Sequence, residues 1–140
     1  MSKVAVVYWS GTGNTEQMAE SVADGARNAG ADVTTFTAAE FDADKMDEFD
    51  AIAFGCPSMG AEQLEEDEFE PMFTACEAKL SGKKIALFGS YGWGDGEWMR
   101  EWESRTEADG AKVVGTVIAN GEPDDTAVNE LKNLGGALVE

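Results

Sequence analysis

Short apolar runs alternate with helical patterns along the whole chain. The first run, residues 4–8, is continuously apolar, as is typical of a strand that is buried on both faces. Similar short runs predict four more strands, and the segments between the strands carry apolar residues at helical spacing. The predicted strands are 4–8, 33–36, 51–54, 85–88 and 113–118, and the predicted helical faces lie within 18–26, 69–80, 98–102 and 128–138. This alternation predicts one α/β domain over residues 1–140, a doubly wound parallel sheet with helices on both faces.

Three irregular loops follow three of the predicted strands. Residues 10–15 follow the first strand, 56–62 follow the third, and 89–96 follow the fourth. Ligands of open parallel sheets bind beyond the carboxyl ends of the strands. We therefore expect these three loops to converge on one binding site.

The first loop has the composition of a phosphate site. Its glycines allow a tight turn that aims backbone N–H groups inward, and the following helix N-terminus attracts anions. No Gly-Lys pair follows, so the loop is not a Walker A motif, and Glu16 stands where a dinucleotide fingerprint would have its third glycine. The alternative is an ordinary glycine-rich turn with an Asn or Thr cap. The loop residues are Ser10, Gly11, Thr12, Gly13, Asn14 and Thr15.

The charge and composition exclude several classes of function. The formal charge is −18, from 28 acids and 10 bases, and such a surface repels nucleic acid and anionic membranes. It attracts partners with basic docking faces, although acidity can also serve solubility alone. The absence of histidine removes Ser-His and Cys-His catalysis and the usual zinc sites. Cys56 and Cys76 are too far apart for a C-x-x-C pair, and the chain starts directly with a strand. We therefore expect a cytoplasmic, monomeric protein without a signal peptide or metal.

The three loops carry a family resemblance. The segment Tyr8–Thr15 resembles the FMN phosphate signature of short-chain flavodoxins, and 55–60 and 87–94 resemble the other two FMN loops of that family. The resemblance runs nearly end to end. It implies a flavodoxin-like sheet of order 2-1-3-4-5 and a low-potential one-electron carrier with non-covalently bound FMN, in place of ferredoxin. It implies redox partner proteins with basic docking surfaces, namely low-potential oxidoreductases and flavin reductases, and no catalytic residues.

The resemblance also assigns roles around the flavin ring. Trp93, which lies among glycines, would stack on the outer face, and Met59 would cover the inner face. The Gly60 peptide would flip on one-electron reduction so that its carbonyl accepts a bond from flavin N5, and Glu62 would bind N3–H. The alternatives are a Trp that closes the sheet edge and a solvated Glu62. The implied FMN-binding residues beyond the first loop are Pro57, Ser58, Met59, Gly60, Ala61, Glu62, Ser90, Tyr91, Gly92, Trp93, Gly94 and Asn120.

Two positions depart from the family pattern. Pro57 replaces a serine of some relatives and cannot donate a hydrogen bond, so that contact is lost or moves to Ser58. Ala61 stands in the predicted turn Met59–Glu62, where a type II-like turn needs a positive φ at its third residue. We therefore expect strain at Ala61. Asn120 follows the fifth strand, where it can reach the ribityl region.

Two other functions fit the same fold class. One is an FMN-dependent enzyme such as a quinone reductase, for which the chain has no spare length to build a substrate pocket. The other is a receiver domain, but the first and third strands do not end in the acids that such domains use for Mg²⁺. Fold alone does not separate the three possibilities, and the loops favour the electron carrier.

Overall fold

A parallel five-stranded sheet forms the centre of the protein. The computed structural model describes residues 2–60 and 62–139. The strands are β1 (Lys3–Tyr8), β2 (Asp32–Thr37), β3 (Ala51–Gly55), β4 (Lys84–Tyr91) and β5 (Lys112–Asn120). Every neighbouring pair is parallel, in the order β2-β1-β3-β4-β5, which confirms the predicted fold class.

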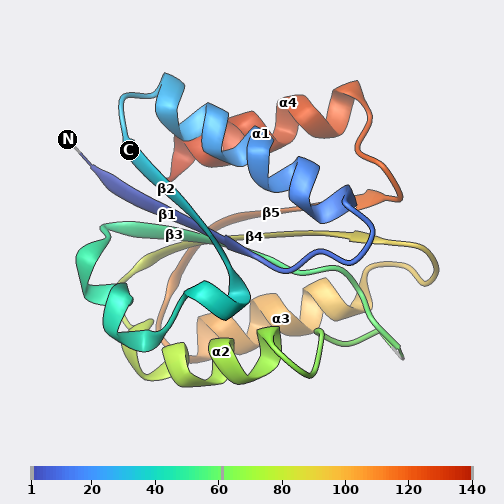
Figure 1. The fold of residues 1–140 in the computed structure, drawn as a ribbon, viewed down its shortest axis with the longest axis horizontal. Helices are drawn as coiled ribbons and strands as arrows, with labels where there is room; N and C mark the ends of the chain where they lie inside the picture. The colour runs from blue at the N-terminus through green and yellow to red at the C-terminus, as the bar shows by residue number, and fades with distance from the viewer. Residues whose placement is uncertain (1, 61, 140) are drawn as a thin grey trace.

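Four α-helices cover the two faces of the sheet. They are α1 (Asn14–Asn28), α2 (Phe69–Cys76), α3 (Glu97–Ala108) and α4 (Asp125–Ala137). Helices α1 and α4 pack on one face, and α2 and α3 on the other (Figure 1). Among the described residues, no helix combines the length and the hydropathy of a membrane-spanning segment.

The continuous apolar runs have a simple structural cause. In β1, Ala5 and Val7 join the core under α2 and α3, whereas Val4 and Val6 join the core under α1 and α4. Both faces of the strand are thus buried, so no polar position interrupts it. The α2/α3 side is rich in aromatic rings, and Phe54 lies edge-on to Phe73 with ring centroids 5.1 Å apart.

The structure extends two strands beyond the prediction. Strand β4 continues to Tyr91 and β5 continues to Asn120, and these two residues pair with each other. Gly89 and Ser90 interrupt the apolar run in β4, and Asn120 ends the one in β5, which explains why the hydropathy pattern gave shorter strands. The segment between β2 and β3 also forms 3₁₀ turns, Ala38–Glu40 and Ala43–Glu48, which the sequence pattern did not indicate.

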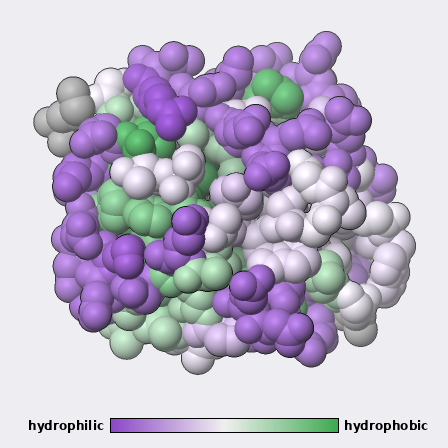
Figure 2. All heavy atoms as spheres, viewed as in Figure 1, coloured by the Kyte–Doolittle hydropathy of each residue, from purple (hydrophilic) through white to green (hydrophobic). Residues whose placement is uncertain are grey.

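The surface matches the charge of the sequence. On the face drawn in Figure 2, hydrophilic side chains (purple) cover much of the surface and leave smaller apolar patches between them. The described large apolar side chains that remain exposed are Met59, Trp93 and Ile118. Two of these three belong to the loops that the sequence singled out.

Candidate functional site

A cavity lies where the three loops converge, at the carboxyl ends of β1, β3 and β4. Its volume is about 370 Å³, within the range of small-molecule sites. It is lined by Trp9, Gly11, Thr12, Asn14, Pro57, Ser58, Met59, Ser90, Tyr91, Gly92 and Gly121. A larger cavity, of about 670 Å³, lies between the ends of α1 and α4, and none of the three loops reaches it.

The structure thus brings together about half of the residues that the sequence selected. Those outside the lining are Ser10, Gly13, Thr15, Gly60, Glu62, Trp93, Gly94 and Asn120. Asn120 instead faces a separate cavity beside α4, and the neighbouring Gly121 lines the candidate site. Trp9 is a wall of the cavity that the sequence did not single out, although its place directly after β1 was a usable signal.

The first loop (residues 10–15, here loop 1) leaves backbone donors free. The Oγ of Ser10 accepts hydrogen bonds from the N–H groups of Gly13 and Glu16, at 3.0 and 3.3 Å, and so shapes the start of α1. The N–H groups of four other residues have no acceptor among the described residues, namely Gly11, Thr12, Asn14 and Thr15. Free N–H groups at a helix N-terminus are the donor set that a phosphate requires.

Thr15 and Ser90 have a structural role that the sequence did not indicate. Both are buried, and their hydroxyl oxygens lie 2.9 Å apart in a hydrogen bond. The Ser90 carbonyl also accepts a bond from the Ser58 N–H at 2.9 Å. Ser90 therefore ties loop 1 and the loop after β3 to the end of β4, and the Thr15 hydroxyl takes part in this tie.

The two apolar side chains beside the cavity are unusually exposed. Trp93 is 62% exposed and Met59 is 37% exposed. Trp93 sits on the loop between β4 and α3, and a Trp that closed the sheet edge would be buried. Exposed large apolar side chains next to a cavity mark a surface that a ligand or partner covers.

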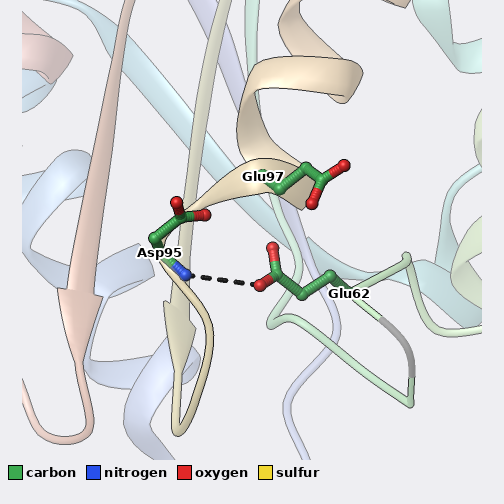
Figure 3. Close-up of side chains that lie close together, drawn as sticks. All are labelled: Glu62, Asp95 and Glu97. Carbon is green, nitrogen blue, oxygen red and sulfur yellow. Dashed lines mark hydrogen bonds between the residues drawn. The ribbon is translucent and has the colours of Figure 1, made fainter.

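Glu62 caps helix α3. Its Oε2 accepts a hydrogen bond from the Trp98 N–H at 3.1 Å, and its Oε1 accepts one from the Asp95 N–H at 3.3 Å. Figure 3 shows this carboxylate directed at the start of α3, close to the carboxylates of Asp95 and Glu97. An acid is favourable at a helix N-terminus because free N–H groups and the helix dipole are positive there. The half-buried Glu62 is therefore not a freely solvated side chain.

Gly94 makes room for this cap. It has φ of +88°, and a Cβ built on it would overlap the Glu62 carboxylate. We expect Gly94→Ala to destabilise the apoprotein by about 2 kcal/mol, from left-handed backbone strain and displacement of Glu62. The control is Gly92→Ala, because a Cβ at Gly92 meets no atom within 4 Å and its φ is ordinary. Urea unfolding of the two apoproteins measures the difference, and equal stabilities would contradict this role of Gly94.

The loop after β3 closes through a pair of backbone hydrogen bonds. Met59 and Gln63 exchange two backbone hydrogen bonds, of 2.8 and 2.9 Å, around residues 60–62. These bonds close the loop at Gln63, one residue beyond the predicted turn Met59–Glu62, and that turn includes a residue outside the described ones, so it stays a prediction. Positive φ values of 53° occur at Gly60 and Glu62. Ala61 lies outside the described residues, so the expected strain there stays a prediction.

Glu65 is a buried structural acid. It is only 6% exposed, and its carboxylate accepts hydrogen bonds of 2.8 Å from the N–H groups of Asp67, Glu68 and Phe69. Burial by itself would raise its pKa, but the three backbone donors outweigh burial and lower the pKa below its ordinary value. The sequence presented Glu65 as one acid in a solvated run, and no local pattern distinguished it from its neighbours.

Comparison with known proteins agrees with this geometry. The family model described as flavodoxin matches residues 6–135. The chain is 51% identical to the flavodoxin of Megasphaera elsdenii over 137 residues, which cover 98% of both chains. It is 51% identical to the flavodoxin of Clostridium beijerinckii over 121 residues, 86% of this chain and 88% of the relative. The solution structure of two-electron reduced Megasphaera elsdenii flavodoxin superposes with a TM-score of 0.91 and 50% identity, and covers 97% of this chain and 98% of its own. The chain belongs to the flavodoxin family.

Proposed function

We propose that this protein carries single electrons on one non-covalently bound FMN, which the cavity between the three loops holds. One observation supports this proposal most strongly. Four backbone N–H groups of loop 1 have no acceptor among the described residues, and loop 1 forms part of the cavity wall. When bound, FMN supplies the one-electron redox chemistry. The protein chain binds FMN, orients it and shields it from water, and it contributes no catalytic residue of its own.

The donor set fits an FMN phosphate at the loop 1 end. The four N–H groups and the N-terminus of α1 favour a dianion without a positive side chain, and neither Lys nor Arg lines the cavity. The flavin ring would lie toward the other two loops, where Met59 and Trp93 offer exposed apolar surface. Backbone near Gly92–Gly94 would meet its polar edge. Glu62 would stabilise the ring site indirectly, because it caps α3 and its carboxylate already accepts two backbone hydrogen bonds. A direct bond to N3–H of the flavin would be its lesser role.

Replacing Trp93 tests the ring position. Stacking of a base on an aromatic side chain is worth about 1–3 kcal/mol. Trp93→Ala should therefore weaken FMN binding by roughly 5- to 150-fold and quench less flavin fluorescence. The measurement is a fluorescence titration of the apoprotein with FMN, and Trp93→Phe should retain most of the affinity. If Trp93→Ala binds and quenches as the parent does, Trp93 does not cover the ring.

The alternative of an FMN-dependent quinone reductase is not favoured, because the two relatives at 51% identity are both flavodoxins. The proposal treats residues 1–140 as one FMN-binding domain that acts as a monomer.

The two cysteines fit a cytoplasmic location. Cys56 and Cys76 are free and buried, which is compatible with the reducing conditions of a cytoplasm. Burial raises the pKa of both thiols, which keeps them protonated and unreactive.

The partners that fit this surface are redox proteins with basic docking faces. Ten acids and no base lie between Lys45 and Lys79, beside the loops of the cavity. Glu65 is excluded from the docking surface because it is buried, whereas Glu66 and Asp67 are exposed. Surface charges are screened over about 8–10 Å at physiological ionic strength, so association should depend on salt.

Electron transfer to a basic c-type cytochrome should therefore slow steeply as salt rises. Neutralising Glu66 and Asp67 together should lower the bimolecular rate severalfold at low salt and leave the rate within the preformed complex nearly unchanged. Stopped-flow measurements of the FMN-loaded, reduced protein separate the two rates. The exposed acids Asp32, at the start of β2, and Glu107, near the end of α3, provide a control pair because neither lines a cavity beside the loops. A rate that does not depend on salt would rule out electrostatic docking.

A further inference from the structure

A second cavity lies on the other side of loop 1 from the proposed FMN site. Its volume is about 460 Å³. Residues from β1, loop 1, the first turn of α1, the 3₁₀ turn after β2 and the segment before α2 line it. They are Tyr8, Trp9, Ser10, Gly11, Gly13, Glu16, Thr37, Ala38, Ala39 and Glu68. Trp9 and Gly11 line both cavities, so the two sites share a wall.

Hydrogen bonds from two aromatic side chains orient two carboxylates in this cavity. The Tyr8 hydroxyl donates to Oε2 of Glu16 at 3.1 Å, and the Trp9 indole Nε1–H donates to Oε1 of Glu68 at 3.0 Å. Each bond fixes one carboxylate oxygen and leaves the other available. Neither acid forms an ion pair within the described chain, and neither Lys nor Arg lines the cavity.

The charge around the cavity is negative beyond these two acids. Burial raises the pKa of Tyr8, and so do the hydrogen bond to Glu16 and the charges of Glu16, Glu20 and Glu40. Glu40 accepts bonds from the N–H and the hydroxyl of Thr37, which itself lines the cavity. The charges that raise the pKa of Tyr8 all come from acids, and none of the described residues that line the cavity is basic.

We propose that this cavity receives one arginine side chain of a redox partner protein, placed between the carboxylates of Glu16 and Glu68 and against Tyr8 and Trp9. The proposal rests on the electron-carrier function and names an anchor for that docking. A guanidinium group fits this lining better than an ammonium group does. It is planar, it offers several donors to separate carboxylates, and it packs favourably on aromatic rings.

An arginine at this place would dock the partner beside loop 1. Arginine is enriched among the residues that contribute most to protein–protein affinity, in particular where its side chain fills a pocket. The exposed acids of the 62–68 segment would then steer association, and this cavity would fix the position of the bound partner. The Trp9 indole N–H reports on the cavity because it forms one of its walls.

The test uses the FMN-loaded, ¹⁵N-labelled protein and three short capped peptides, Gly-X-Gly, where X is arginine, citrulline or lysine. Citrulline has the shape of arginine without its charge. We expect the arginine peptide to shift the Trp9 indole resonance, assigned through Trp9→Phe, along a saturating curve. The citrulline peptide should leave the resonance in place, and the lysine peptide should bind about threefold or more weakly than arginine.

The matched variants are Glu16→Gln and Glu68→Gln, because a Gln oxygen still accepts the Tyr8 or Trp9 bond. Each single variant should lower the affinity for the arginine peptide about threefold, and the double variant should lower it about tenfold, as expected for exposed charge pairs. Asp67→Asn removes an adjacent exposed acid that does not line the cavity, and it should not weaken binding measurably.

Three results would overturn the proposal. The first is an equal shift of the Trp9 indole resonance with the citrulline peptide. The second is a shift that does not saturate and that Asp67→Asn reduces as much as Glu68→Gln does. The third is a shift with magnesium chloride but none with the arginine peptide. The flavin absorbance of the same sample reports on the proposed function separately. A sample that retains FMN and ignores the arginine peptide contradicts the anchor alone. A sample that binds the peptide but no FMN contradicts the electron-carrier function alone.

Discussion

Replacing Glu65 by alanine should lower the free energy of unfolding by about 3 kcal/mol, although Glu65 belongs to an acidic run. The variant leaves the N–H groups of Asp67, Glu68 and Phe69 without their acceptor, and the Phe69 N–H is buried at the start of α2. A loss of this size corresponds to a fall of roughly 10 °C in melting temperature for a protein of this length. Thermal and urea unfolding of the apoprotein measure it.

The pH dependence gives this prediction a second readout. The pKa of Glu65 is lower in the folded protein than in the unfolded chain, so its ionised form stabilises the fold. This contribution is complete above the unfolded pKa, about 4.5, and is lost as the pH falls through the folded value. The difference between parent and Glu65→Gln should therefore shrink below about pH 4.5. Asp67→Ala, at an exposed neighbour, should stay within about 0.5 kcal/mol of the parent. If Asp67→Ala and Glu65→Ala lose equal stability, the capping role is wrong.

Replacing Ser10 by alanine should weaken FMN binding by about 2 kcal/mol, roughly thirtyfold. The Ser10 hydroxyl oxygen holds the N–H groups of Gly13 and Glu16 and so fixes the path of loop 1. Without it, the free donors of the loop no longer point to one place before FMN binds. Fluorescence titration of the apoprotein with FMN gives the dissociation constant.

A serine elsewhere on α1 separates this effect from a general loss of helix stability. The Ser21 hydroxyl bonds only to the Gln17 carbonyl, within the helix and away from the cavity. Ser21→Ala should bind FMN with parent affinity. If Ser10→Ala also binds with parent affinity, the shape of loop 1 does not depend on that hydroxyl.

The fold could be predicted from the sequence because each buried strand has no polar face. The runs at 4–8, 51–54 and 85–88 are apolar on both sides, since helices cover both faces of the sheet. The ends of β4 and β5 could not be predicted in the same way. Tyr91 and Asn120 continue the ladder through backbone hydrogen bonds, which carry no hydropathy signal.

The convergence of the loops was predictable, but the roles of single acids within them were not. The carboxyl ends of parallel strands share one edge, so the topology alone brings residues 10–15, 56–62 and 89–96 together. Glu62 caps α3 through long-range bonds that tertiary structure sets. Glu65 caps α2 through local bonds to the residues two to four positions later. A single sequence does not distinguish such an acid from a solvated neighbour. Because Glu65 is buried, the proposed docking surface includes the exposed Glu66 and Asp67 but not Glu65.

The ratio of FMN to riboflavin affinity tests most directly whether the cavity binds FMN with its phosphate in loop 1. Riboflavin carries the same ring and ribityl chain but lacks the phosphate. Each hydrogen bond to a charged group contributes about 1.5–3 kcal/mol to stability or binding. Several N–H groups of loop 1 have no acceptor among the described residues and can donate to the phosphate. The apoprotein should therefore bind FMN at least about a hundredfold more tightly than riboflavin. If the dissociation constants of the two ligands lie within about threefold of each other, loop 1 does not bind the phosphate.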